Sequence, residues 1–349
     1  MAQAPPPPAS RENPFGDLLD LASARLGGLP LATSDDFFAE KENLLKVEPA
    51  EFQVGAYTDR GKWMDGWESR RSRTPGKDHD WVVIRLGLPG EILGVDVDTS
   101  YFVGNAPEAV AIDALDHTGA LRPHEVDTLP ASAWREVLPL TKVERGAHNF
   151  LALPASGRAT HLRLRIFPDG GVARFRAYGV VAPDWSRLVP GQLVDLASIA
   201  WGGKALASND SFFSPRDNIN LPWSSRRMDE GWETRRRRTY NASADGGDWN
   251  LLRLGKPGTL RQVVIETHHF KGNPPDTARL EALSLPGADA ATALASDLWK
   301  TLLPDQPLEP HQTHTFSSEL IDLGVVSHVR IVINPDGGVS RLRLFGVQG

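Results

Sequence analysis

Apolar and polar residues alternate in most of the short apolar segments of this chain. Examples are WVVIRLG at 81–87, HLRLRIF at 161–167, WNLLRLG at 249–255 and HVRIVI at 328–333. A period of two puts successive side chains on opposite faces, which is typical of a strand with one face on a core. Turn sequences such as GLPGE, PDGG and KGNPP separate such segments. The pattern therefore predicts a mainly β protein.

Helical spacing of apolar residues is brief. It covers only 15–26, 131–138, 194–200 and 296–303. We expect short helices there, placed as caps at the ends of a β-sandwich.

Long tracts of the chain occur twice. HLRLRIFPDGGVARFRAYGV at 161–180 aligns without a gap with HVRIVINPDGGVSRLRLFGV at 328–347, and GWESRRSR at 66–73 returns as GWETRRRR at 231–238. The spacing of roughly 165 to 175 residues is the size of a domain and too long for a solenoid unit. The chain is therefore one domain that has been duplicated.

The two copies suggest a division of the chain into four parts. We expect a disordered proline-rich tail over 1–12, a first repeat over 13–181, a linker over 182–190 and a second repeat over 191–349. Many short strands with Gly and Pro turns, and no alternation of strands with helices, predict an all-β fold of two tandem jelly-roll sandwiches.

Composition narrows the class of protein. A chain of 349 residues with 40% hydrophobic residues can bury two cores. The absence of cysteine excludes disulfides and a cysteine nucleophile and fits a cytoplasmic location. A net charge of −6 with interspersed signs argues against a nucleic-acid partner, and no apolar stretch approaches the roughly 20 residues of a membrane span. We expect a soluble protein.

Common catalytic signatures are missing, so the chemistry must lie in the repeated polar tracts. There is no G-x-S-x-G, H-E-x-x-H, P-loop or G-x-G-x-x-G sequence. The first tract offers four arginines as a clamp for a carboxylate, because guanidinium stays charged and matches a carboxylate with two hydrogen bonds. The alternative is that they pair with acids and tie strands together. These arginines are Arg70 and Arg71 in the first copy and Arg235 and Arg236 in the second.

A second polar tract, DTSYFVGN and ETHHFKGN, ends a strand in a Gly-Asn turn at the rim of each sandwich. Its second copy is richer in groups that move protons. The alternative is that its histidines are structural. The aligned candidates are Asp98 with Glu266, Tyr101 with His269, Val103 with Lys271 and Asn105 with Asn273.

Other residues recur without a clear role. The PDGG sequences at 168–171 and 335–338 are typical of hairpin turns. The acids Asp35 and Asp210 either anchor a loop or face a ligand.

Together these tracts resemble the allantoicase family, and the match covers nearly everything after the proline tail. The tracts SDDFF, GWESRRSR, HDWVVIRLGLPG and DTSYFVGN occur in order, and each has a second copy. The resemblance implies two galactose-binding-like jelly-roll repeats. It also implies a hydrolase of linear amidine C–N bonds that splits allantoate into ureidoglycolate and urea in purine degradation. A metabolic enzyme of this kind is expected to form homo-oligomers.

Carried over by position, the resemblance implies Glu266 and His269 as the acid and base. Arginine would bind the allantoate carboxylate, and Lys271, Asn273, Asp98 and Asn105 would contact the substrate. A divalent metal, manganese or zinc, stays open as a cofactor, since no metal-ligand spacing is strong enough to claim it. A non-catalytic jelly roll that binds a carbohydrate is the competing class.

Overall fold

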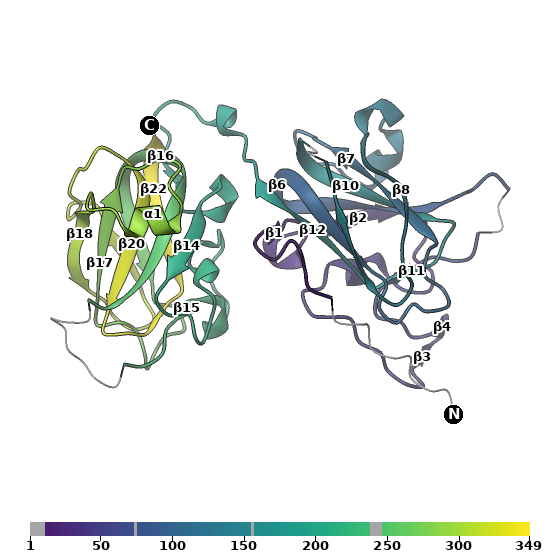
Figure 1. Ribbon diagram of the computed structural model, residues 1–349, viewed down its shortest axis with the longest axis horizontal. Helices are drawn as coiled ribbons and strands as arrows, with labels where there is room; N and C mark the ends of the chain where they lie inside the picture. The colour runs from purple at the N-terminus through teal and green to yellow at the C-terminus, as the bar shows by residue number, and fades with distance from the viewer. Residues whose placement is uncertain (1–10, 73–74, 155–156, 238–245) are drawn as a thin grey trace. The chain divides into compact units, whose positions relative to one another are not determined.

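The structure is a computed structural model that describes residues 11–72, 75–154, 157–237 and 246–349. It consists of two compact units, Met1–Ala182 and Pro183–Gly349, each built mainly from strands (Figure 1). We call them repeat 1 and repeat 2. Most of the expected proline-rich tail lies outside the described residues, as does Arg73.

The strands of the two repeats follow in the same order, except that repeat 1 has an additional strand pair, β3 and β4. Repeat 1 contains β1 (Leu19–Asp20), β2 (Leu29–Thr33), β3 (Tyr57–Thr58), β4 (Gly61–Lys62), β5 (Trp67–Glu68), β6 (Asp80–Asp98), β7 (Ala109–Leu115), β8 (Arg135–Lys142), β9 (His148–Ala152), β10 (Arg158–Phe167), β11 (Gly171–Val172) and β12 (Arg174–Val181). Repeat 2 contains β13 (Val194–Asp195), β14 (Lys204–Ser208), β15 (Trp232–Glu233), β16 (Asp248–Glu266), β17 (Thr277–Leu283), β18 (Lys300–Pro307), β19 (Thr313–Phe316), β20 (Val325–Asn334), β21 (Gly338–Val339) and β22 (Arg341–Gln348).

Helical elements in the described residues are short. They are the α-helix α1 (Ala290–Leu294) and the 3-10 helices η1 (Ala24–Leu26), η2 (Lys41–Leu45), η3 (Pro123–Thr128), η4 (Ala131–Ala133), η5 (Trp185–Arg187), η6 (Ile199–Trp201), η7 (Arg216–Asn220) and η8 (Met228–Glu230).

Each repeat has one eight-stranded sheet in which a single long strand serves two layers. The order is β1-β12-β6-β10-β7-β8 in repeat 1 and β13-β22-β16-β20-β17-β18 in repeat 2. The first part of β6 pairs with β2 and β10, and its last part pairs with β12 and β9. Because β6 passes from one set of partners to the other, the sheet closes into a two-layered sandwich. The prediction of a duplicated all-β jelly roll is confirmed.

The core follows the predicted alternation. Along β10, Leu162, Leu164 and Ile166 are fully buried, and the residues between them are only partly covered. In each repeat a tryptophan, Trp67 or Trp232, is also fully buried. These two residues begin the arginine tracts, so the core fixes the point from which each tract leaves the sandwich.

The prediction of four short helices was wrong. Three of the segments hold only a single 3-10 turn, and the fourth, 296–303, runs into strand β18. Ser23 and Ser198 do cap their turns, but Gly27 and Gly202 in left-handed conformation end them one turn later. Each segment also contributes residues to a strand at a sheet edge, namely β1, β8, β13 or β18, where pairing with a neighbour overrides helical spacing.

Asp20 gives repeat 1 a pH-dependent stability. Its carboxylate accepts the backbone N–H groups of Ala22 and Ala177, and burial raises its pKa from 3.8 to about 6. The folded protein therefore holds a proton that the unfolded chain has lost, and the free energy of unfolding falls as pH rises from about 4 to 6. We expect D20N, whose amide oxygen still accepts both bonds, to lose this dependence. Relative to wild type it should gain up to about 3 kcal/mol between pH 4 and pH 7 in urea unfolding; an equal pH dependence in both proteins would contradict this.

Candidate functional site

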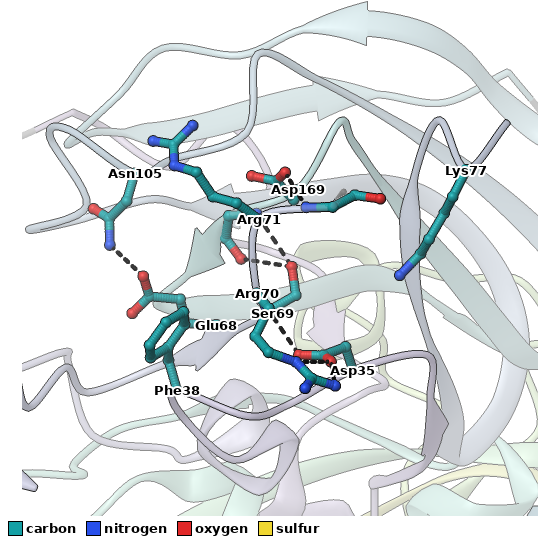
Figure 2. Close-up of a pocket in the computed structure, with 11 residues that line it drawn as sticks. Asp35, Phe38, Glu68, Ser69, Arg70, Arg71, Lys77, Asn105 and Asp169 are labelled. Atoms are coloured by element: carbon teal, nitrogen blue, oxygen red, sulfur yellow. Dashed lines mark hydrogen bonds and ion pairs between the residues drawn. The ribbon is translucent and has the colours of Figure 1, made fainter. Parts of the chain in front are cut away.

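Loops at one end of repeat 1 enclose a pocket of about 750 Å³. The loops follow β2, β5, β6 and β10, and Figure 2 shows the side chains that line it. We call it the arginine pocket. Its lining residues are Asp35, Phe38, Glu68, Ser69, Arg70, Arg71, Ser72, Lys77, Asn105, Asp169 and Gly170.

Arg70 forms a hydrogen-bonded ion pair with Asp35. The carboxylate accepts the Arg70 backbone N–H at 2.9 Å and its Nε at 2.7 Å, while the Trp67 indole N–H donates to the Asp35 carbonyl at 2.8 Å. Burial alone would raise the pKa of Asp35, but the hydrogen bonds and charge of Arg70 outweigh it and hold that pKa below its usual value. This arginine therefore anchors the loop, as the structural alternative predicted.

Arg71 is uncommitted. Its side chain is exposed and makes no hydrogen bond or ion pair with any described residue. Figure 2 shows it extending from the loop on the side opposite to Arg70. A guanidinium without a protein partner at a pocket is free to bind an anionic ligand.

Glu68 and Asn105 form the second feature of the pocket. The Asn105 amide donates to Glu68 Oε1 at 2.6 Å. Burial raises the pKa of Glu68, although the Asn105 hydrogen bond and the charges of Arg71 and Lys62 oppose the rise. The pocket thus holds a carboxyl group that keeps its proton to a higher pH than an ordinary glutamate, beside a free cation.

The PDGG turn forms another wall of the pocket, a role beyond the hairpin turn that its sequence predicts. Asp169 Oδ2 accepts the Ser72 backbone N–H at 2.9 Å, and the Gly170 carbonyl accepts the Ser69 N–H at 3.0 Å. A Cβ on Gly171 would lie 2.0 Å from the Phe102 ring. The second glycine therefore lets the turn pack on Phe102, which belongs to the DTSYFVGN tract at the end of β6; we call this tract and its second copy, ETHHFKGN, the strand-end tract. The recurrence of Asp169 as Asp336 was the signal that could have identified it.

Lys77 also lines the pocket, although no sequence pattern indicates it. Its ammonium lies 2.5 Å from Asp80 Oδ1, and Asp80 is fully buried at the start of β6. The lysine has no counterpart in the second copy, where Gly-rich sequence precedes the same aspartate. No comparison of the copies could therefore point to it.

Repeat 2 builds the same framework. Burial likewise raises the pKa of Glu233, the counterpart of Glu68. The matching contacts are Arg235 N to Asp210 Oδ1 (3.0 Å), Arg235 Nε to Asp210 Oδ2 (2.9 Å), Trp232 Nε1 to the Asp210 carbonyl (2.9 Å), Asn273 Nδ2 to Glu233 Oε1 (2.7 Å), Arg237 N to Asp336 Oδ2 (2.6 Å) and Thr234 N to the Gly337 carbonyl (3.1 Å).

The arginines of both tracts lie on loops. Strand β5 ends at Glu68 and β15 at Glu233, so the arginines follow the strands and are not part of them. Adjacent residues Arg70 and Arg71 both line the pocket as a result. The Asp35 carboxylate, which binds Arg70 through main chain and side chain, determines this loop path.

The structure separates the residues of the strand-end tract. Asn105 lines the arginine pocket, whereas Asp98 is buried and accepts hydrogen bonds from Ser100, with its pKa raised by burial. Glu266 is 6% exposed and accepts the Arg343 Nε at 3.1 Å. These two acids therefore support the ends of β6 and β16.

The remaining candidates lie on the turn after β16. The His269 Nε2 atom lies 3.0 Å from the Ser225 carbonyl, and its backbone N–H donates to the His311 ring at 2.8 Å. His269 has φ 73°, and its counterpart Tyr101 has φ 68°, so the turn is left-handed in both repeats. Lys271 is exposed nearby, and Asn273 belongs to the Glu233 framework.

The described residues contain no group of three or more His, Asp or Glu residues arranged to hold a metal ion. Nor does the described part of the chain contain a helix long and apolar enough to cross a membrane.

The fold and site define a class: a duplicated jelly-roll protein with an acid, an amide and a free arginine at the sandwich rim. A family model described as the allantoicase repeat matches residues 19–182 and again 194–349. The chain therefore belongs to the allantoicase family.

Individual relatives agree with this assignment. The chain is 46% identical to probable allantoicase 2 of Burkholderia pseudomallei, with 94% of each chain covered. It is 45% identical to the probable allantoicase of Pseudomonas aeruginosa, over 97% of this chain and 98% of the relative. The crystal structure of allantoicase from Saccharomyces cerevisiae matches with a TM-score of 0.71 at 32% identity, covering 95% of this chain and 93% of that one. These matches do not favour the carbohydrate-binding alternative.

Proposed function

We propose that the arginine pocket of repeat 1 is the site at which this chain hydrolyses allantoate. Membership of the family supplies the overall reaction: allantoate and water give ureidoglycolate and urea, a step of purine degradation. The observation that carries the location is the free Arg71 guanidinium beside the protonatable Glu68.

The pocket matches the substrate group by group. Allantoate is one carbon that bears a carboxylate and two ureido groups. Arg71 binds the carboxylate, because its guanidinium has no protein partner among the described residues. Carboxylate and amide oxygens of Asp169 and Asn105 accept the ureido N–H groups. The pocket volume of about 750 Å³ is ample for a ligand of this size.

Glu68 serves as the proton carrier. The lone pair of one ureido nitrogen expels the other ureido group, and protonated Glu68 donates its proton to the departing nitrogen, which leaves as urea. Water then adds to the C=N carbon, and the Glu68 carboxylate takes a proton from that water. The product is ureidoglycolate, and Glu68 ends the cycle protonated, so atoms and protons balance.

The raised pKa of Glu68 suits this role, since burial keeps the carboxyl protonated closer to neutral pH. The Asn105 hydrogen bond holds the carboxyl in one orientation. Positioned proton transfer contributes about 10²–10⁴-fold to such a reaction, and orientation and electrostatics supply the rest.

Glu266 and His269 remain a rival assignment for the acid and base. If they transfer protons, H269A and E266Q should each lower kcat by about 10²–10⁴-fold. We expect less than a tenfold change, because Glu266 is held by Arg343 and His269 by the Ser225 carbonyl. Urea release at saturating allantoate measures kcat, and unfolding temperatures show whether each variant folds. A larger loss in folded H269A would return the proton transfer to this pair.

The cellular location and the oligomeric state of the protein are also part of the proposal. We infer a cytoplasmic enzyme that forms homo-oligomers, from the cysteine-free composition and the metabolic reaction. Sedimentation of the purified chain measures its assembly directly.

A further inference from the structure

Repeat 2 retains the free guanidinium as well as the framework around it. Arg236 is exposed and makes no hydrogen bond or ion pair with any described residue, as is true of Arg71. The neighbouring Arg235 is committed to Asp210, as Arg70 is to Asp35. Each repeat therefore presents one uncommitted arginine next to one anchored arginine.

The charge balance of the two sites is also preserved, although by different residues. In repeat 1 the Lys77 ammonium neutralises the buried Asp80 at 2.5 Å. In repeat 2 the Arg237 guanidinium reaches the equivalent Asp248 at 2.8 Å. Because a cation from a different position neutralises this aspartate, Arg237 is occupied and Arg236 remains the one available for a ligand.

The acid and amide are equivalent as well. Asn273 donates to Glu233 at 2.7 Å, and burial raises the pKa of Glu233. A purely structural framework would need the anchored arginine and the Asn–Glu pair but not an unpaired guanidinium. The arrangement offers a cation for a carboxylate and oxygens for N–H donors, and these are the two groups of a ureido acid.

We propose that repeat 2 carries a second binding site for a small carboxylate with a ureido group, so that each chain binds two such ligands. The site consists of Arg236, Glu233, Asn273 and Asp336. The ligand class rests on the function proposed for repeat 1, whereas the site itself rests on the contacts of repeat 2.

The aromatic residues next to the anchored arginine are more exposed in repeat 2 than in repeat 1. In repeat 1 the Arg60 guanidinium donates to the Phe37 carbonyl and lies 5.5 Å from the centre of the Phe37 ring. Repeat 2 has a shorter loop before its tryptophan, and Phe212 and Phe213 are 62% and 59% exposed. Since exposed neighbours cover less of a ligand, we expect repeat 2 to bind the same ligand more weakly than repeat 1.

Calorimetric titration of the full chain with N-carbamoylglycine tests the proposal. This probe has the carboxylate and one ureido group but lacks the second ureido group that hydrolysis releases. Wild type should bind two equivalents with unequal affinity. R236A should lose the weaker site and R71A the tighter one, each by about 10- to 100-fold in Kd.

Matched controls separate this proposal from that for repeat 1. R227A removes an exposed guanidinium that pairs with Asp229 and should still bind two equivalents. A single equivalent in wild type that R71A removes would overturn the second site and leave the first in place. Two equivalents in R236A would also overturn it. An unchanged kcat/KM for allantoate in R71A would instead refute the catalytic pocket, whatever the number of ligands bound.

Discussion

Replacing Arg71 with alanine should lower kcat/KM for allantoate by about 10- to 100-fold, mostly through a higher KM. A hydrogen-bonded contact with a charged group contributes about 1.5–3 kcal/mol, and Arg71 makes no hydrogen bond or ion pair with a described residue that its loss would break. The effect is therefore one on binding and not on folding. Initial rates of urea release over a range of allantoate concentrations measure it.

Two variants make the Arg71 result specific. R71K keeps the charge but loses the paired N–H groups, so it should recover part of the affinity. R227A removes an exposed arginine outside both frameworks and should have wild-type kinetics. The assignment of Arg71 fails if R71A and R227A are kinetically alike.

Replacing Glu68 with glutamine should lower kcat by about 10²–10⁴-fold and change the pH profile. The wild-type enzyme needs protonated Glu68, so its kcat/KM should fall as pH rises through the pKa of that carboxyl. Burial places this pKa above the ordinary value of 4.5. Glutamine neither donates a transferable proton nor titrates, so the residual activity of E68Q should not show that ionisation.

The stability of E68Q shows whether a loss of activity comes from catalysis or from folding. The glutamine oxygen can still accept the Asn105 amide, so E68Q should unfold at a temperature no lower than wild type at pH 7. A buried carboxyl with a raised pKa costs stability once it ionises, and the neutral amide avoids this cost. A folded E68Q that retains both its turnover rate and the wild-type pH profile would exclude Glu68 as the proton carrier.

The fold was largely predictable because its signals are local and repeated. Alternation such as HLRLRIF specifies strands through side-chain direction alone, and the duplication shows which segments belong to one unit. The prediction of helices was wrong because the structure of those segments is not determined by local signals. Residues 131–138 have helical spacing, but strand β8 begins at Arg135 and pairs with β7. Pairing with another strand, which the residues of 131–138 do not reveal by themselves, decides such a case.

The site was predictable only in its residue types. The tracts pointed to arginine, acid and asparagine at a sandwich rim, and Arg70, Arg71 and Asn105 do line one pocket. They did not distinguish Arg70 from Arg71. That distinction depends on Asp35, which lies 35 residues from Arg70 in the chain and binds it directly.

The sequence by itself determined the duplication, the β-sandwich class and the family, because these depend on periodicity and on the order of motifs. Only the tertiary structure decided which charged side chains anchor loops and which are available to bind a ligand. It placed Glu68 against Asn105, Asp169 against Ser72 and Lys77 against Asp80. The availability of a side chain for chemistry is a property of its partners in space, and these partners come from loops that meet only when the sandwich closes.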